Sequence, residues 1–393
     1  MKYTIGELAE IIDGDRGKNY PKQHEFLDNG YCLFLNTGNV TATGFLFESN
    51  QYISKEKDDS LRKGKLQRRD IVYTTRGTVG NAAFYSDDVP YEHVRINSGM
   101  VIIRPKKEIV CTEFLYQILR SNHYRPYFKK CCTGSAQPQL PIKNLSTIEL
   151  DLPDLCVQRR IADILSAYDD LIENNRKQIK LLEEAAQRLY KEWFVDLRFP
   201  GHETTPVVDG IPEGWKKERL VDLVDVQYGY AFDGSLFNAT GNGMPIIRIR
   251  NIPSGNTGNY TTEKADPQYV VHNGDILVGM DGEFHVNSWN GLDAYLVQRT
   301  CSFRPHNLNM KGYLFQAIYE PIKYFESTVV GATVAHLGKK HIDTIAVLTC
   351  PDKLYVPFQQ YFERRQSLLN QNRLLAEARD RLLPKLMSGE LEV

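Results

Sequence analysis

The sequence lacks the features of several common classes of protein. No apolar run approaches the roughly 18 residues of a membrane-spanning helix, and the opening MKYTIGELAEIIDG does not have the pattern of a signal peptide. The seven cysteines, among them the neighbours Cys131 and Cys132, form no C-x-x-C pair, which argues against a disulfide framework or a zinc site. We therefore expect a soluble cytoplasmic protein with mostly buried thiols.

Motifs of nucleotide- and cofactor-dependent enzymes are also missing. No G-x-x-x-x-G-K-[ST] loop is present to hold ATP, and the nearest string to the N-P-P-[FYW] motif of adenine methyltransferases is NIPS at 251–254, which does not match. The nine histidines are scattered, and no Ser/His/Asp or Cys/His arrangement is apparent. We predict no catalytic residue, no metal site and no cofactor site in this chain.

The net charge of the chain does not decide between the possible classes of function. The formal net charge of −1 argues against a uniformly basic coat for nucleic acid, although a local basic groove balanced by acids elsewhere is compatible with it. The 393 residues, of which 42% are hydrophobic, are sufficient for two or three domains with substantial cores.

The most regular feature that is present is a pair of long amphipathic segments, at 153–199 and 351–393. Apolar residues recur every three or four positions through most of both segments, which predicts two long helices. Asp154 is placed to cap the first helix, and Pro200 with Gly201 is expected to stop it.

The length of these helices predicts that they pair with each other. About forty residues at about 1.5 Å each make a rod of roughly 60 Å, which one compact domain cannot cover. In an antiparallel coiled coil the midpoints meet, so that Asn175 would face Asn372 and fix the register. The alternative is that each Asn faces water.

The sequence outside the helices is a divergent repeat. The segment RLVDLVDV (219–226) corresponds to TIGELAEI (4–11), and NGDILVGMDG (273–282) corresponds to RRDIVYTTRG (68–77). A period near 200 residues indicates a duplicated domain with a pseudo-twofold axis rather than a solenoid. We therefore divide the chain into a first domain (1–152), a central helix (153–199), a linker (200–214), a second domain (215–350) and a C-terminal helix (351–393).

Each repeated domain is predicted to be mixed, which gives an α+β fold class overall. In the first domain the patterns predict a short helix at Ile5–Ile12, strands within 32–40, 69–77 and 99–105, a helix at Thr112–Asn122 and a last strand at Ser146–Leu152.

Three segments carry a family resemblance: EEAAQRLYKEWFVDLRFPG (183–201), IPEGWKKERL (211–220) and LLPKLMSGELEV (382–393). They resemble the helical regions of specificity subunits of type I restriction–modification systems, the HsdS family. The order of domains, linker and repeat also resembles that family, so the likeness covers the whole chain. One departure is that Gly214 and Trp215 have no counterpart at the start of the first half.

The resemblance implies a non-catalytic DNA-reading subunit with two target recognition domains. Each domain would read one half of a split target in double-stranded DNA, and the helices would set the spacer between the halves. Two methyltransferase subunits, using S-adenosylmethionine, would dock on this chain and methylate adenine. Restriction subunits with ATP- and Mg-dependent translocation and nuclease activity would join them.

DNA contacts are expected from polar and basic side chains on loops, because Arg can grip guanine and Asn or Gln adenine. The candidates in the first domain are Asn36, Asn39, Thr74, Thr75, Arg76, Thr78, Arg95, Asn97, Gln137, Gln139 and Lys143. Those in the second domain are Arg248, Arg250, Asn251, Asp281, Gln298, Arg299, His336, Lys339 and Lys340. For each of them the alternative is an ordinary surface or turn residue.

The two most polar loops differ between the halves. The first domain has TTRGTVG (74–80) and GSAQPQL (134–140), whereas the second has GMDGEFH (279–285) and GATVAHL (331–337). We therefore predict two different half-sites and an asymmetric target.

Trp193, Phe194 and Leu197 end the first helix with an apolar cluster that is larger than a two-helix seam requires. Docking of a methyltransferase subunit is one interpretation, and packing against the neighbouring domain is the other.

Two other classes of function are a scaffold and a self-contained enzyme. A coiled-coil scaffold without DNA recognition would show no salt-dependent affinity for duplex DNA. A self-contained modification enzyme or nuclease would need the motifs that this sequence lacks.

Overall fold

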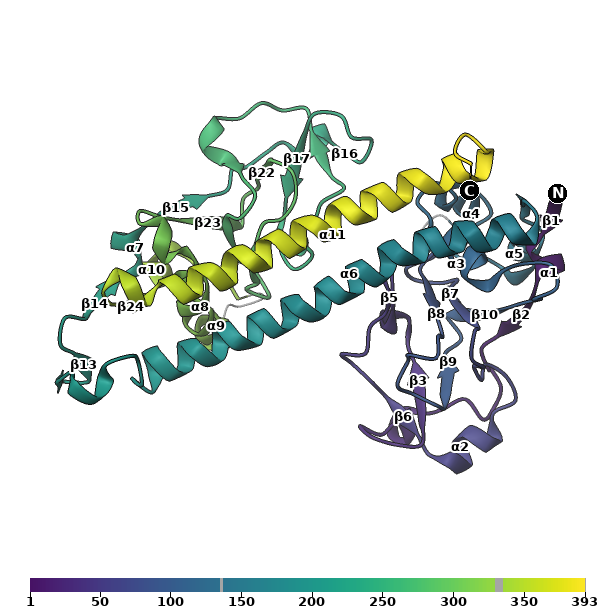
Figure 1. Ribbon diagram of the computed structural model, residues 1–393, viewed down its shortest axis with the longest axis horizontal. Helices are drawn as coiled ribbons and strands as arrows, with labels where there is room; N and C mark the ends of the chain where they lie inside the picture. Colours follow the sequence, from purple (N-terminus) through teal and green to yellow (C-terminus); the bar gives the residue numbers. More distant parts are fainter. Residues whose placement is uncertain (135–136, 329–334, 393) are drawn as a thin grey trace. The chain divides into compact units, whose positions relative to one another are not determined.

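The structure, a computed structural model, describes residues 1–134, 137–328 and 335–392 (Figure 1). The two internal gaps in this description fall within the predicted loops GSAQPQL and GATVAHL, so those parts of the predicted loops lie outside the described residues.

The chain forms two compact units. Unit 1 consists of Met1–Asp170 and Leu375–Val393, and unit 2 consists of Leu171–Leu374. Both units combine sheets with helices, so the predicted α+β fold class is confirmed. Two long helices, α6 (Leu155–Tyr190) and α11 (Val356–Ser388), contribute to both units.

The remaining elements fall into two similar series. Those of unit 1 are β1 (Lys2–Thr4), α1 (Ile5–Leu8), β2 (Ala9–Asp13), β3 (Cys32–Leu35), β4 (Val40–Thr41), β5 (Gly44–Phe45), β6 (Tyr52–Ile53), α2 (Lys55–Ser60), β7 (Ile71–Thr74), β8 (Ala82–Phe84), β9 (Val94–Ile96), β10 (Met100–Pro105), α3 (Thr112–Arg120), α4 (Arg125–Lys130), α5 (Ile142–Ser146) and β11 (Glu149–Asp151). Those of unit 2 are β12 (Val207–Val208), β13 (Ile211–Pro212), β14 (Lys216–Arg219), α7 (Leu220–Leu223), β15 (Val224–Tyr228), β16 (Phe237–Asn238), β17 (Met244–Ile247), β18 (Tyr260–Thr261), β19 (Val270–Val271), β20 (Ile276–Gly279), β21 (Val286–Ser288), β22 (Ala294–Leu296), β23 (Thr300–Pro305), α8 (Lys311–Ala317), α9 (Tyr319–Thr328), α10 (Lys339–Ile342) and β24 (Ala346–Thr349).

Strand order shows that the two units repeat the same topology. The four-stranded sheet β2-β10-β7-β8 of unit 1 corresponds to β15-β23-β20-β21 of unit 2, and all neighbours in both sheets are antiparallel. The pair β1-β11 corresponds to β14-β24, and the parallel pair β3-β9 corresponds to β17-β22. The duplication inferred from the sequence is therefore a duplication of topology.

β10, one of the two central strands in the four-stranded sheet of unit 1, is buried on both faces. In β10, Val101 and Ile103 pack into one hydrophobic cluster, while Met100 and Ile102 pack into another on the opposite face. A run of consecutive apolar residues, rather than an alternating pattern, is what such a strand requires. This sheet is the platform from which the loops of unit 1 project.

The long helix α6 begins as predicted but ends earlier than predicted. The Asp154 carboxylate accepts a hydrogen bond from the backbone N–H of Val157 at 2.9 Å, which caps the helix. Regular α-helix stops at Tyr190 and continues as one wide π-helical turn over Lys191–Val195. Leu197 then adopts a left-handed conformation with φ of 56°, which turns the chain away before Pro200 and Gly201 are reached.

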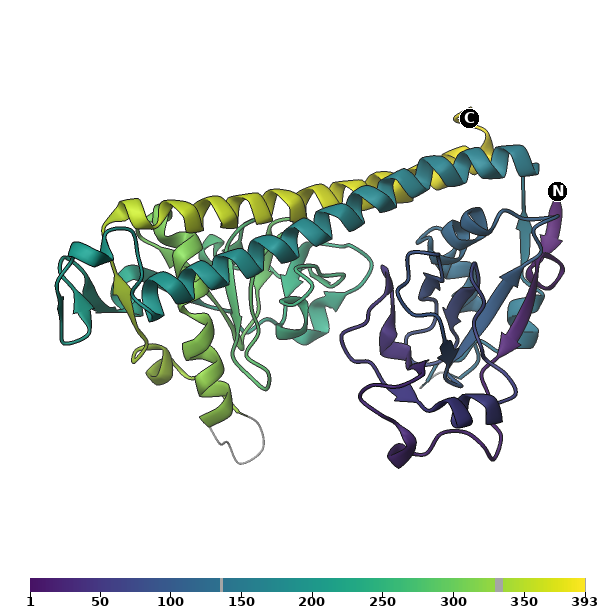
Figure 2. The ribbon, with the colours of Figure 1, turned by 60° about the horizontal axis from the view of Figure 1, so that its bottom comes forward.

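In unit 2, α6 and α11 lie side by side and antiparallel (Figure 1, Figure 2). Asn175 Nδ2 donates to Asn372 Oδ1 at 2.9 Å, and further along Arg365 Nε donates to the Glu183 carboxylate at 2.6 Å. The residue number rises along one helix as it falls along the other. The two asparagines therefore face each other, as an antiparallel pairing requires.

Unit 1 contains the other ends of the same two helices. The Asp169 carboxylate on α6 accepts a hydrogen bond from Arg379 on α11 at 2.6 Å. The same carboxylate also accepts from Gln117 on α3 at 2.6 Å and pairs with Arg120 at 3.0 Å. Polar contacts in this unit thus join both long helices to α3.

The helix predicted at Ile5–Ile12 is wrong over half its length. The α-helix covers only Ile5–Leu8, and Ala9–Asp13 form β2, which pairs with β10. Thr4 and Glu7 form a capping box that supports a single turn. The apolar residues after Leu8 are compatible with a helix or with an edge strand. Pairing with β10, which is distant in sequence, favours the strand.

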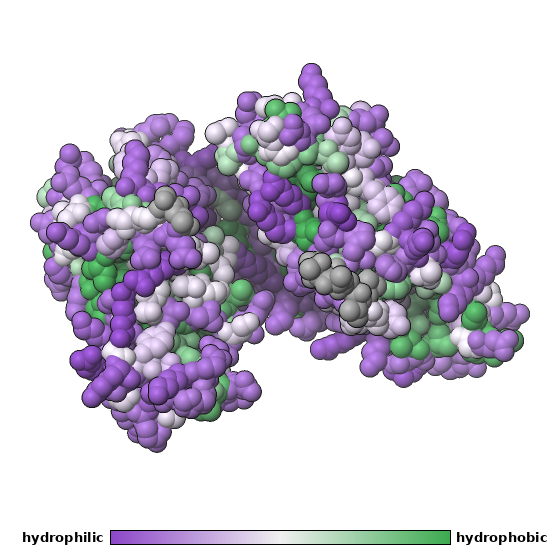
Figure 3. Space-filling view, turned by 180° about the vertical axis from the view of Figure 1, so that it is seen from behind, coloured by the Kyte–Doolittle hydropathy of each residue, from purple (hydrophilic) through white to green (hydrophobic). Residues whose placement is uncertain are grey.

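The surface is mostly hydrophilic on the face drawn in Figure 3, where apolar residues form separate spots. Within the ranges that the structure describes, we find no helix of sufficient length and apolarity to cross a membrane.

Candidate nucleic-acid interface

Unit 1 brings the two predicted reading loops together at one end of its four-stranded sheet. The backbone N–H of Leu140 donates to the Thr75 carbonyl at 2.9 Å, and Arg76 pairs with Gln139 across an antiparallel bridge. Thr78 and Gln137 are exposed beside them. We call this set of side chains, Arg76, Thr78, Gln137 and Gln139, the first reading edge.

Unit 2 repeats this backbone arrangement with different side chains. The backbone N–H of Leu337 donates to the Met280 carbonyl at 2.7 Å, and Asp281 pairs with His336 across an antiparallel bridge. Arg299, from the turn between β22 and β23, reaches the same place. We call Asp281, Arg299 and His336 the second reading edge.

The three side chains of the second reading edge contact one another. Arg299 Nε lies 3.4 Å from the Asp281 carboxylate, and the His336 ring, through Nδ1, is within hydrogen-bond distance of that carboxylate. Arg299 Nη1 lies 3.4 Å from His336 Nδ1. Asp281 therefore holds a guanidinium and an imidazole at one exposed point.

The backbone of Arg299 is strained. Its φ is 70°, in the left-handed region that residues other than glycine rarely adopt and that costs roughly 1–3 kcal/mol. The hydrogen bond from the Met280 N–H to the Arg299 carbonyl, at 2.9 Å, holds this conformation. The corresponding bond in unit 1 runs from Thr75 to Gly99, where a Cβ atom would lie only 2.8 Å from Thr37. A side chain at this position of unit 1 would therefore require Thr37 to shift.

The polar groups of five predicted DNA contacts are bonded within the fold, and their role in DNA binding stays a prediction. Thr74 and Thr75 are buried, and their hydroxyls donate to the carbonyls of Thr78 and Gly99. Asn39 is buried and donates to the carbonyls of Leu46 and Ser49. The Asn251 side chain accepts from the Arg248 N–H and donates to the Asn256 carbonyl, which caps a short turn. Arg95 is only 5% exposed. Asn36 and Asn97 similarly accept hydrogen bonds from the nearby N–H groups of Gly38 and Gly99, although both remain partly accessible.

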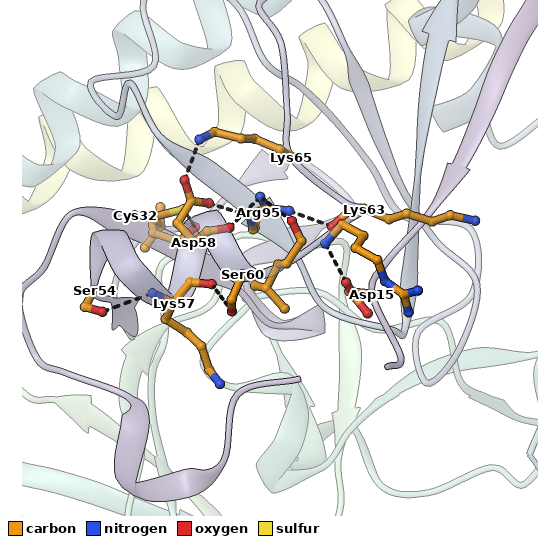
Figure 4. Close-up of polar contacts among 12 residues, drawn as sticks. Asp15, Cys32, Ser54, Lys57, Asp58, Ser60, Lys63, Lys65 and Arg95 are labelled. Atoms are coloured by element: carbon orange, nitrogen blue, oxygen red, sulfur yellow. Dashed lines mark hydrogen bonds and ion pairs between the residues drawn. The ribbon is translucent and has the colours of Figure 1, made fainter. Parts of the chain in front are cut away.

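Arg95 belongs to a buried ion cluster (Figure 4). It bonds to the Asp58 carboxylate, which is 0% exposed, and to the carbonyls of Leu61 and Lys63, while Lys65 pairs with the same carboxylate. Burial alone would raise the pKa of Asp58, but Lys65 and Arg95 lower it below the ordinary value. The stabilisation is therefore present at neutral pH and is lost as the pH falls through the lowered pKa.

The remaining candidates lie outside the two reading edges. Arg248 stacks on the Phe237 ring, with 4.5 Å from the guanidinium carbon to the ring centroid, and its pKa is lowered by burial and by the neighbouring Arg250 charge. Arg250 donates to the Asn259 amide oxygen at 2.7 Å. The candidates Lys143, Gln298, Lys339 and Lys340 are exposed.

The apolar cluster at the end of α6 packs mainly within unit 2. Phe194 is buried, with its ring centroid 4.5 Å from that of Tyr313 and 5.0 Å from that of Trp215. Phe194 therefore packs within unit 2, which is the alternative that the sequence left open, and docking at Phe194 stays a prediction. Trp193 and Leu197 are half-buried, so part of each side chain is accessible.

The sequence prediction missed two basic residues beside the first reading edge. Arg125 and Lys129, both on α4, line a hollow that Thr78 also borders. The only signal for them is the basic string RPYFKK at 125–130. No group of three or more His, Cys, Asp or Glu side chains that could hold a metal ion occurs among the described residues.

Comparison with known proteins gives a consistent result. The family model described as type I restriction modification DNA specificity domain matches residues 1–184 and 212–372. The chain is 27% identical over 341 residues to the type I restriction enzyme MjaIX specificity subunit of Methanocaldococcus jannaschii, covering 82% of this chain and 78% of that one. It is 25% identical over 466 residues to the type I restriction enzyme HindI specificity subunit of Haemophilus influenzae, covering 98% and 100%.

A solved structure also matches in fold. The S subunit of a type I restriction–modification system from M. genitalium aligns with a TM-score of 0.53 at 14% sequence identity, covering 98% of this chain and 96% of that one. At this identity the likeness concerns the fold alone.

The ion cluster around Asp58 gives a prediction about stability. Arg95→Ala leaves a fully buried carboxylate with Lys65 as its remaining charged partner, and we expect unfolding of unit 1 to require about 3 kcal/mol less free energy. Urea unfolding measures this loss. The control Arg16→Ala removes an exposed ion pair with Asp13 and should change stability by less than about 1 kcal/mol. Equal unfolding midpoints for both variants would contradict the structural role of Arg95.

Proposed function

We propose a function from one premise: the chain belongs to the family of type I restriction–modification DNA specificity subunits. On this premise it is the non-catalytic, DNA-reading subunit of such a system, acting in the cytoplasm. The observation that carries the proposal is that each unit places two corresponding loops at the end of its own four-stranded sheet, and that these loops have different side chains in the two units. Each reading edge would read one half of a split target.

The chemistry of the two edges supports two different half-sites. The first edge offers Arg76 with the amides of Gln137 and Gln139, groups that can pair with guanine and adenine in the major groove. The second edge offers Arg299, held by Asp281 beside His336. A guanidinium that is already oriented loses less freedom when it binds a base, so we assign to Arg299 the reading of a guanine.

Adenine methylation and DNA cleavage would then come from partner subunits. Two methyltransferase subunits would bring S-adenosylmethionine, and restriction subunits would bring ATP and Mg. The half-buried Trp193 and Leu197, together with the exposed Val195, are the surface that we propose for one methyltransferase contact.

The long helices α6 and α11 would set the distance between the half-sites. An antiparallel pair fixed by Asn175 with Asn372 and by Glu183 with Arg365 cannot slide without breaking these bonds. A fixed register gives one permitted spacer rather than several.

The test of this function is a map of methylated adenines. We expect coexpression of this chain with the methyltransferase subunit of its own system to produce methylation at one split motif whose two halves differ. Long-read sequencing of the host DNA measures this. A stable complex without methylation would favour a scaffold, and two identical inverted halves would contradict the asymmetric target. Methylation by this chain alone would show that it is catalytic.

Arg299 provides a test of base reading. Arg299→Ala should relax the requirement for one guanine in one half-site by about 10- to 100-fold and leave the other half-site unchanged. Asp281→Asn, which keeps the size of the side chain, should weaken the same position less. The control Arg219→Ala removes an exposed arginine that pairs with Asp222 and should leave the methylation map unchanged. Relaxation in both half-sites, or in neither, would argue against the assignment.

The helices provide a test of the spacer. Four residues inserted after Asn175, matched by four before Asn372, add about 6 Å to the paired helices, close to two base pairs of about 3.4 Å each. We expect the methylation map to show the same half-sites with a spacer one or two base pairs longer. The control is a four-residue insertion after Asp209, in the β12–β13 turn, which should leave the spacer unchanged. Loss of one half-site with an unchanged spacer would refute the proposal that the long helices set the spacer.

A further inference from the structure

Unit 1 contains a hollow next to the first reading edge. Its volume is about 630 Å³, and it lies between the β7–β8 loop, with Thr78 and Asn81, and the loop after α4, with Gly134 and Pro138. Arg125 and Lys129 of α4 form another part of its wall. These two cations are four residues apart, on one face of the helix. None of the described residues that line the hollow is acidic.

Arg125 has no described partner for one of its buried donors. Its Nε group is inaccessible to solvent and has no hydrogen-bond partner among the described residues. Because Nε is closed to solvent, an anion in the hollow would interact with Arg125 through the charge of the guanidinium rather than through Nε.

The hollow beside the β20–β21 loop of unit 2 has a mixed lining. Its acidic residues include Glu283 and Glu320, and its basic residues are Lys323, Arg365 and His285. Lys323 is paired with Glu326 at 2.8 Å, and Arg365 is paired with Glu183. The described lining of the unit 1 hollow has basic side chains without acidic ones, so its charge favours an anion.

We propose that this hollow binds a phosphate of the DNA backbone next to the first half-site, with Lys129 and Arg125 as its ligands. The inference rests on the proposed function, because the first reading edge must lie against DNA for a phosphate to come within reach. A phosphate would neutralise both cations, which share the hollow with no acidic side chain among the described residues. The contact fixes where the duplex sits on unit 1 without reading its sequence.

The test uses the chain in complex with its methyltransferase subunit and duplexes that carry the mapped target. We expect Lys129→Gln to lower the magnitude of the slope of log K against log salt concentration by about 1, which is the loss of one phosphate contact. Arg125→Gln should have a similar effect. Both variants should keep the base preference of both half-sites, because the contact carries no sequence information.

The matched control is the neighbouring lysine. Lys130 is on the same helix and equally exposed, but it lies near the Tyr127 ring and does not line the hollow. Lys130→Gln should leave the slope unchanged. Equal slopes for Lys129→Gln and the wild type, or equal losses for Lys129→Gln and Lys130→Gln, would overturn the proposal. So would a changed base preference, which would mean that the hollow receives a base. If the wild-type complex does not bind duplex DNA, it is the proposed function that fails.

Discussion

The polar contacts along the seam between α6 and α11 are the constraint on which the rest of the structure depends. Apolar helix faces tolerate sliding by whole turns, whereas a buried amide or ion pair is satisfied in only one register. Asn175 with Asn372 and Glu183 with Arg365 act in this way in unit 2. Arg365 also donates to the side chains of Asn287 and Ser288, the last two residues of β21, which is the strand that follows the loop with Asp281. The same arginine thus connects the helix register to the position of a reading edge.

Duplication explains how one backbone can present two chemistries. One backbone hydrogen bond is kept in both units. It runs from the Leu140 N–H to the Thr75 carbonyl in unit 1 and from the Leu337 N–H to the Met280 carbonyl in unit 2. Backbone bonds of this kind do not depend on side-chain identity. The exposed residues next to them are therefore free to diverge without loss of fold, as Arg76 and Asp281 have done.

The sequence was sufficient for the fold class and the repeat, because helical periodicity and a duplicated pattern can be read from the chain itself. For Asn175 and Asn372 it left two alternatives open, and the hydrogen bond between them decides for the facing pair. It was insufficient for Ile5–Ile12, where a distant partner strand outcompetes the helix beyond Leu8. For the candidate site, the fold brings Arg76 beside Gln139 and Asp281 beside His336, while the DNA contacts predicted for these residues stay predictions. Arg95 was misplaced because a polar residue at a strand end looks the same in sequence whether it faces solvent or a buried Asp58.

The near-zero net charge of the chain has a physical consequence for a DNA reader. Non-specific affinity for duplex DNA grows with the number of phosphates that cations neutralise, so a balanced chain with 48 basic and 49 acidic residues gains little from its overall field. Its cations must act from particular places. The Asp281 carboxylate holds Arg299 while reducing the local positive charge, which favours a base contact over general attraction to the backbone. Arg125 and Lys129 have no acidic neighbour among the described residues that line their hollow, so their charge would be available to the proposed phosphate. On the proposed function, base reading and attachment to the DNA backbone would fall to different side chains.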